Sequence, residues 1–280
     1  LKDYSILIKT LNLDIKYFGF RWWHLLKVKK QFLRHNIDKF DLIVDLQTKL
    51  RNTLILKKIP TKNFYSATYK FSFCTIKDSY TTKKNICEMT LANLEKFLNT
   101  KINRINYNIT SISDEFFKEA KRLLPNNNYI GFSITQGNEY RKKSWPLKNF
   151  IELAKKLQML KKTPVFFIEK SNKDIANKIK LEIPEALIPE FDSNFSSPAL
   201  VTALSSRLEK AISIDNGVMH MISLASVPII ALFGPTDSEK FAPKYESSMV
   251  LDSKKIYNTK NISSITVQDV LLAAKQPVNS

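Results

Sequence analysis

The stretch KAISIDNGVMHMISLASVPIIALFG, residues 210–234, decides the fold because it holds a strand, a helix and a second strand in succession. KAISID (210–215) and VPIIALFG (227–234) are apolar runs of strand length, and GVMHMISLAS (217–226) between them is a helix candidate. Strands that alternate with single helices indicate parallel sheets covered on both faces. The stretch therefore predicts an α/β fold.

The same alternation extends over most of the chain. Further strands are predicted at 39–46, 128–135 and 163–169, and further helices at 47–59, 113–124, 149–162, 172–181, 197–206 and 264–276. In these helices Ser113 is the expected N-cap of the second, and Thr266 with Asp269 can cap the last. The polar, asparagine-rich segment 100–113 separates two α/β runs and is the candidate interdomain linker.

Composition sets limits on function. The net charge is +18, and residues 1–70 hold 15 Lys and Arg against 5 Asp. A basic face fits a nucleic acid, an acidic substrate or an anionic membrane, and it also fits a plain lysine-rich bias. No apolar run reaches the 18 residues of a membrane-spanning helix. Cys74 and Cys87 form no metal motif, and His24 and His35 are expected to be structural.

SIDNGVMH (213–220) is the first candidate site. Asp215 follows a strand at the carboxyl edge of the predicted sheet, where ligands bind. Asn216 and Gly217 both tolerate positive φ and predict a tight turn. The helix start after them offers free N–H groups to phosphate, and His220 can point at the same anion. Asp215 would accept hydrogen bonds from sugar hydroxyls. The competing interpretation is an ordinary turn with Asp215 as N-cap.

Two more loops follow strands at the same predicted edge. FGPTD (233–237) has a glycine for close backbone approach, and Thr236 and Asp237 can cap a following helix. TQGNEYRKKSWP (135–146) brings basic residues that could clamp a diphosphate. The alternative for this loop is a solvated basic segment with Trp145 as a packing anchor.

Three motifs in order resemble glycosyltransferase family 9, the bacterial heptosyltransferases. Residues 211–243 resemble the family's C-terminal signature, which is a strand, Asp-Ser/Thr-Gly-x-x-His, a helix, a strand and Phe-Gly-Pro-Thr. Residues 143–146, KSWP, are similar to its Lys-x-Trp-Pro element, and FDLIVDLQTKLRN (40–52) resembles its Tyr-Asp-x-x-x-Asp-x-Gln motif. The resemblance spans residues 40 to 276.

This resemblance implies a GT-B fold of two Rossmann-like domains that face a cleft. Residues 1–112 would form an acceptor-binding domain, residues 113–262 a nucleotide-sugar-binding domain, and residues 263–280 a helix that crosses back to the first domain. The implied reaction is inverting transfer from ADP-heptose, or a related nucleotide sugar, to an anionic lipid A–Kdo acceptor of the lipopolysaccharide inner core. The chain would act in the cytoplasm, peripherally at the inner membrane, without a cofactor. No Asp-x-Asp motif is present, which favours metal-independent transfer.

The resemblance also implies site residues. Those for the nucleotide sugar are Thr135, Gly137, Lys143, Glu169, Asp215, Asn216, Gly217 and His220, with Arg141 as a further cation beside Lys143. Those for the acceptor are Gln47, Lys49 and Arg51.

The sequence departs from the family pattern in two places. Asn216 stands where the family has Ser or Thr, so the donor sugar is less defined. The family's first strand and its Gly-Asp loop, which carries the general base, are not found, and the chain is expected to lack both. The alternatives are therefore a nucleotide-sugar-binding module without transferase activity, or a basic nucleic-acid-binding protein. No nucleic-acid-binding motif is visible, so no nucleic-acid partner is expected.

Overall fold

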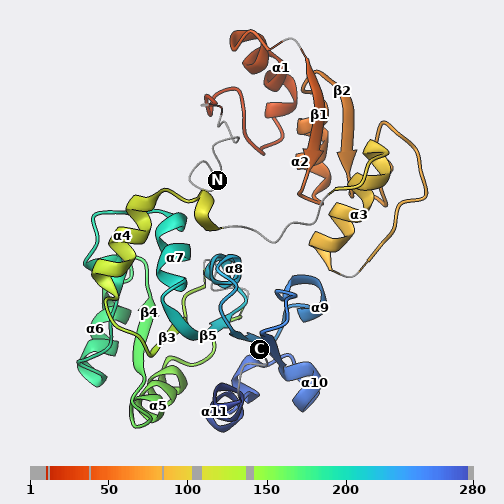
Figure 1. The fold of residues 1–280 in the computed structure, drawn as a ribbon. Coiled ribbons are helices and arrows are strands. Elements are labelled where there is room, and N and C mark those ends of the chain that lie inside the picture. Colours follow the sequence, from red (N-terminus) through yellow and green to blue (C-terminus); the bar gives the residue numbers. More distant parts are fainter. Residues whose placement is uncertain are drawn as a thin grey trace. The chain divides into compact units, whose positions relative to one another are not determined.

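The computed structural model describes residues 11, 13–37, 39–83, 85–102, 109–136 and 142–276. These residues fall into two compact units (Figure 1). We call residues 11–102 the N-terminal unit and residues 109–276 the C-terminal unit. Gly137 and Arg141 lie outside the described residues.

A parallel five-stranded sheet forms the centre of the C-terminal unit, with strand order β4-β3-β5-β6-β7. The strands are β3 (Tyr129–Ser133), β4 (Thr163–Phe167), β5 (Leu208–Ile214), β6 (Ile229–Phe233) and β7 (Ser248–Asp252). Every residue of β3 and β6 is buried. Such near-continuous apolar strands need helices on both faces, which confirms the predicted parallel, doubly covered sheet.

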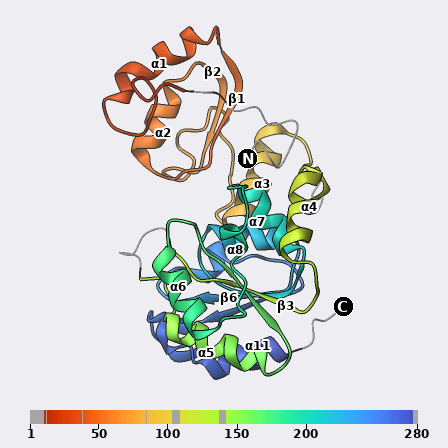
Figure 2. The ribbon, with the colours of Figure 1, turned by 90° about the vertical axis from the view of Figure 1, so that its left-hand side faces the viewer.

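Six helices cover the two faces of this sheet. On one face lie α5 (Leu147–Gln158), α6 (Lys173–Glu182) and α11 (Val267–Lys275), and on the other lie α4 (Asp114–Leu123), α7 (Pro198–Ser205) and α8 (Gly217–Leu224) (Figure 2). Successive strand residues point to opposite faces, so Ile212 packs in the core with α5 and Ala211 in the core with α7. Two short helices, α9 (Ser238–Phe241) and α10 (Ser253–Tyr257), flank β7 along the chain.

The N-terminal unit has a smaller sheet. Its parallel strands are β1 (Phe40–Asp45) and β2 (Thr61–Ser66), and its helices are α1 (His24–Arg34), α2 (Leu50–Lys57) and α3 (Ile86–Leu98). One core, around Phe32 and Ile55, joins α1 and α2 to the strands, and a second, around Tyr65 and Phe97, joins α3 to them.

Most predicted elements are present, but several observed ones were not predicted. The sequence did not reveal α1, β2, α3, β7 or α10. Thr266 and Asp269 form the predicted capping box at α11. Ser113 is the N-cap residue of α4 as predicted, although its side chain makes no capping hydrogen bond.

The predicted domain limits differ in detail from the units. Ile112 is buried in the core of the C-terminal unit, just before the predicted start at residue 113. Helix α11 packs on α5 within the C-terminal unit. The return of residues 263–280 to the N-terminal domain stays a prediction.

Candidate functional site

The candidate site lies at the carboxyl edge of the five-stranded sheet, between β3 and β5. From β3 the chain moves to β4 on one side, and it later continues with β5 on the other side. The direction of winding therefore changes between these two strands, and ligands of open α/β sheets bind at such a switch point. The predicted residues Thr135 and Asp215 follow β3 and β5, so both lie there.

Asn216 ties the two strand ends together. Its Nδ2 donates to Ser133 Oγ at 2.7 Å and to the Thr135 carbonyl oxygen at 2.8 Å. Its Oδ1 accepts from the Met219 N–H at 2.9 Å, which makes Asn216, rather than Asp215, the N-cap of α8. Both amide hydrogens of Asn216 are thus in use, and the residue fixes the turn.

The turn forms without positive φ angles, although Asn216 and Gly217 both tolerate them. Asn216 is extended, with φ −148°, and Gly217 does not have a positive φ. A Cβ added to Gly217 would meet no atom within 4 Å. The glycine therefore leaves open space in front of the first turn of α8, where backbone N–H groups lack helical partners and attract anions.

Lys143 and Asp215 form a nearly buried ion pair beside this helix start. Lys143 Nζ lies 2.5 Å from Asp215 Oδ2 and 3.3 Å from the Asp215 carbonyl oxygen, and the two side chains are 12% and 8% exposed. The Lys143 N–H also donates to Gln136 Oε1, which holds the loop to the end of β3. The sequence predicted that Lys143 contacts a diphosphate and Asp215 sugar hydroxyls; in the structure the two side chains pair with each other. An ammonium has three N–H donors, so one remains for a phosphate oxygen.

His220 lies one turn into α8, where the charges of Asp215 and Lys143 act on its pKa. Desolvation lowers its pKa below the ordinary histidine value, although the residue is exposed. The Asp215 carboxylate acts in the opposite direction and the Lys143 ammonium in the same one. The imidazole is therefore neutral near pH 7 and can gain a proton when an anion arrives.

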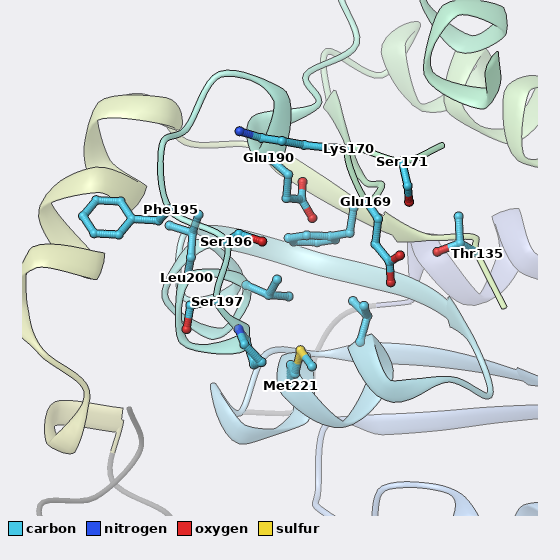
Figure 3. A pocket seen from close by; sticks show the side chains of 14 residues that line it. Thr135, Glu169, Lys170, Ser171, Glu190, Phe195, Ser196, Ser197, Leu200 and Met221 are labelled. Carbon is cyan, nitrogen blue, oxygen red and sulfur yellow. The ribbon is translucent and has the colours of Figure 1, made fainter. Parts of the chain in front are cut away.

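A pocket of about 390 Å³ opens next to this turn (Figure 3). The predicted residues Thr135 and Glu169 line it, and so do Val218 and Met221 on α8. Its other lining residues are Phe167, Lys170, Ser171, Glu190, Phe195, Ser196, Ser197, Pro198, Leu200 and Val201. The apolar walls with a few polar groups are typical of small-ligand sites. Thr135 connects the pocket with the Asn216 turn through its carbonyl oxygen.

The other two predicted loops have structural roles. Trp145 is 2% exposed, and its Nε1 donates to the Ile265 carbonyl oxygen at 2.8 Å, so it is the packing anchor of the alternative interpretation. A Cβ on Gly234 would lie 2.8 Å from the backbone nitrogen of Ile262. The close approach at FGPTD is thus to the protein's own chain. Asp237 caps α9 as predicted, by accepting from the Glu239 N–H.

In the N-terminal unit one of the predicted acceptor residues, Gln47, donates its backbone N–H to a buried carboxylate. Asp45 accepts from the Gln47 N–H at 2.9 Å, from Thr53 Oγ1 at 2.6 Å and from Ser66 Oγ at 2.9 Å. Gln47 and Lys49 are exposed, and Arg51 is partly buried. Within the described residues, Arg51 Nε is buried without a hydrogen-bond partner.

Sequence reasoning missed three polar residues. Ser133 was hidden in an apolar strand, and Asp45 was quoted in a motif without a role. Glu190 follows β4 by 23 positions in an irregular segment, and only its place in the pocket draws attention to it. His24 is structural as expected: its ring nitrogens contact the carbonyl oxygens of Arg21 and Ile15.

None of the helices in the described part of the chain is both long and apolar enough to cross a bilayer.

Comparisons with known proteins give one family. The model of glycosyltransferase family 9 (heptosyltransferase) matches residues 26–269. A family 9 glycosyl transferase from Veillonella parvula DSM 2008 superposes with TM-score 0.70 at 21% identity, over 90% of this chain and 77% of that one.

Two Escherichia coli structures are also similar. Heptosyltransferase WaaC with ADP gives TM-score 0.66 at 16% identity, over 91% of this chain and 78% of that one. ADP-heptose lps heptosyltransferase II gives 0.59 at 16% identity, over 90% and 80%. No curated protein sequence matches the chain. At these identities the structures establish only that this chain shares its α/β fold with the GT-B heptosyltransferases. Since the family model covers most of the residues, the chain belongs to glycosyltransferase family 9, the heptosyltransferases.

Proposed function

We propose that the C-terminal unit binds ADP-heptose, or a closely related ADP-activated sugar, and that the protein transfers the sugar to an anionic acceptor of the lipopolysaccharide inner core. The observation that carries this proposal is the arrangement at the β3–β5 switch point. There the Lys143–Asp215 pair, the open start of α8 and the pocket beside Glu169 lie together on one sheet edge.

Each part of this edge suits one part of the donor. The α8 start, the third N–H of Lys143 and a protonated His220 suit a diphosphate. Asp215, which is held by Lys143, suits sugar hydroxyls through its remaining lone pairs. The pocket suits the nucleoside, with Glu169 as an acceptor for ribose hydroxyls and apolar walls for the base.

The proposed reaction forms a bond between the acceptor oxygen and the anomeric carbon while the bond from that carbon to the β-phosphate oxygen breaks. ADP leaves with the electron pair, and the acceptor hydroxyl gives its proton to a base. Lys143 and the α8 N–H groups stabilise the charge that develops on the departing diphosphate. In this scheme Lys143 takes the role of a metal cation.

We assign the acceptor to the N-terminal unit. Lys49 stands before the first turn of α2, where its side chain makes no capping bond, and Arg51 lies within that turn. These cations and the helix start favour carboxylates and phosphates of an acceptor core. Gln47 is exposed next to them, in a loop that Asp45 holds.

A membrane contact is assigned to the surface around α1. Trp22 is 56% exposed and Leu26 is 85% exposed, and Arg21, Lys27 and Lys30 are exposed among them. Exposed aromatic and aliphatic side chains among cations are typical of segments that lie on anionic lipid. This surface would bring the protein to a lipid-linked acceptor.

Calorimetry with ADP tests the donor site. Lys143→Met is expected to weaken ADP binding by about tenfold to a hundredfold, because a charged partner of phosphate is lost. His220→Ala should weaken it by a smaller factor. Lys162→Met is the matched control, since Lys162 pairs with Glu209 at 2.6 Å beside the starts of β4 and β5, at the opposite edge of the sheet.

Removal of Lys143 also leaves Asp215 unpaired, so the double variant Lys143→Met/Asp215→Asn separates repulsion by Asp215 from loss of the cation. Unchanged ADP affinity in the single variants would rule out this donor site. Transfer is tested by ADP release and product mass with ADP-heptose and a core acceptor that lacks heptose. ADP binding without any transfer would favour the binding-module alternative.

A further inference from the structure

Glu190 is an unexplained acid in the wall of the pocket. It lies in η4 (Pro189–Phe191), which packs against β4, and Figure 3 shows its carboxyl group directed into the pocket near Glu169. Its Oε2 is buried and has no hydrogen-bond partner among the described residues. Buried polar atoms without a partner are rare, and one in a pocket wall points to a missing ligand atom.

The surroundings of Glu190 keep it protonated. Burial raises its pKa to about 8, and the neighbouring Glu169 carboxylate acts in the same direction. The N–H groups of Glu190 itself and of Ile168 act against this. Lys170, the nearby cation of the lining, donates to the Ser193 carbonyl oxygen. The lining residues from α7 and α8 include no titratable group. Near pH 7 the group is therefore a neutral carboxylic acid, which can donate one hydrogen bond.

A protonated Oε2 would offer its hydrogen to the pocket, because the backbone N–H groups already serve the carboxyl group as donors. The apolar walls beside it, which include Phe167, Leu200 and Met221, accommodate a flat ring. A ring nitrogen with a lone pair would satisfy the buried hydrogen. An ionised carboxylate in the same place would have no hydrogen to donate, and its lone pairs would repel that of the ring nitrogen.

We propose that Glu190 determines base specificity in the donor pocket, and that in its protonated form it donates a hydrogen bond from Oε2 to an unprotonated ring nitrogen of the base. This inference rests on the proposed function, because it places the nucleoside of the donor in this pocket. It selects a base such as adenine, whose Watson–Crick edge has an acceptor ring nitrogen. Guanine presents an N–H at the equivalent position, which would meet the hydrogen of Glu190.

The test is calorimetry with ADP from about pH 7 to about pH 9.5, a range in which the ADP phosphates are already ionised. The wild-type protein is expected to lose about tenfold in affinity as Glu190 ionises. Glu190→Gln, whose amide always offers an N–H, should bind ADP near pH 7 and keep only the shallower pH dependence that proton uptake by His220 contributes. Glu190→Ala should bind weakly at every pH.

Two further measurements use the same proteins. Glu169→Gln removes a neighbouring negative charge and should move the midpoint of the wild-type pH profile downward, which a purely structural Glu190 would not produce. GDP should bind the wild-type protein more weakly than ADP near pH 7. The ratio of the two affinities should become smaller near pH 8.5, where Glu190 is mostly ionised and accepts from guanine N–H groups that are still protonated.

The outcomes separate the two proposals. If the wild-type protein binds ADP but Glu190→Gln follows the same pH profile, or Glu190→Ala binds ADP unchanged, the role of Glu190 is wrong and the donor site stands. If the wild-type protein binds ADP at no pH in this range, the proposed function itself is wrong. Circular dichroism of each variant establishes that it is folded.

Discussion

The two units both expose polar loops after parallel strands, but they hold those loops by different means. In the C-terminal unit a five-stranded sheet is covered on both faces, and the amide of Asn216 joins the ends of β3 and β5. In the described part of the N-terminal unit two parallel strands pair, and one buried carboxylate, Asp45, accepts hydrogen bonds from the loop after β1, from α2 and from β2. The larger sheet holds its loops through the Asn216 amide and the Lys143–Asp215 ion pair, which link two strand ends, whereas the smaller one gathers its hydrogen bonds on a single carboxylate.

This difference shows where each unit is vulnerable. A buried carboxylate stabilises a structure only while its donors remain, and its removal leaves several hydroxyl groups unpaired at once. A packed sheet is sensitive to added volume instead where a neighbouring backbone lies in contact, as the backbone of Ile262 does at Gly234. The four predictions below use this contrast, and they run from the largest expected effect to the smallest.

Replacement of the charged group should harm the N-terminal unit most. Asp45→Ala is expected to destabilise it by about 3–5 kcal/mol, since Thr53, Ser66 and the Gln47 N–H lose their common acceptor. Hydrogen exchange of β1 and β2 measures the effect, and β5 should keep its protection. Asp41→Ala is the control, because Asp41 on the same strand pairs with Lys62 at the surface. Equal effects of the two variants would contradict the central role of Asp45.

Glu190, the buried acid of the C-terminal unit, should make that unit less stable when it ionises. The pKa of Glu190 is raised from 4.5 to about 8 in the folded state, so its contribution to stability is full below about pH 4.5 and is lost as the pH rises to about 8. Glu190→Gln lacks this dependence. Relative to that variant, the wild-type protein should lose about 4 kcal/mol over this interval, in urea unfolding followed by Trp145 fluorescence in a Trp22→Phe/Trp23→Phe background. If the unfolding free energies of the wild-type protein and Glu190→Gln changed with pH in parallel, the raised pKa of Glu190 would be refuted.

Substitutions at two glycines distinguish an effect on core packing from an effect on ligand binding. Gly234→Ala should destabilise the C-terminal unit by about 2 kcal/mol, because the new methyl group meets the backbone of Ile262. Gly217→Ala should leave stability unchanged within about 0.5 kcal/mol, since its methyl group enters open space. It should nevertheless weaken ADP binding by several-fold. Thermal unfolding measures the stability of both variants, and calorimetry measures their ADP affinity. A Gly234→Ala protein as stable as the wild type would show that the Ile262 backbone can move away from the new methyl group.

The smallest effect concerns the surface of the N-terminal unit. Leu26→Ala and Trp22→Ala should each lower binding to phosphatidylglycerol vesicles by about threefold to tenfold, in proportion to the apolar area that reaches the lipid. Leu181→Ala is matched, because Leu181 in the C-terminal unit is 82% exposed against 85% for Leu26. If Leu181→Ala lowers binding as much as Leu26→Ala, the contact is not specific to α1. Sedimentation with the vesicles gives the partition coefficients.

Local patterns predicted the elements whose residues lie close in sequence. The apolar runs of β3 to β6 and the capping box at Thr266 depend on neighbours within a few positions, so the sequence alone reveals them. Strand β2, TKNFYS, was missed because its first half is polar and only its last three residues are buried. Its assignment depends on pairing with β1, which no local pattern shows.

The sequence placed Thr135 and Asp215 at the carboxyl edge of the sheet, but it did not predict the contacts made there. Lys143 and Asp215 are 72 positions apart, and each was given a ligand of its own because nothing local indicates that they pair. Gly234 was assigned to a crevice since its neighbour, Ile262, comes 28 positions later. The property that distinguishes Glu190 is a buried, unpartnered oxygen, which arises only when the chain is folded.

The hydrogen bond from Trp145 to Ile265 has a consequence for the handling of this protein. It joins the loop that carries Lys143 to the segment just before α11, so this segment acts as a clasp on that loop. A protease that cuts in the connection between α10 and Ile262 would open this clasp without touching the pocket. Bound nucleotide, by holding the loop from its other side, should slow the release of that segment, and limited digestion would then report donor occupancy.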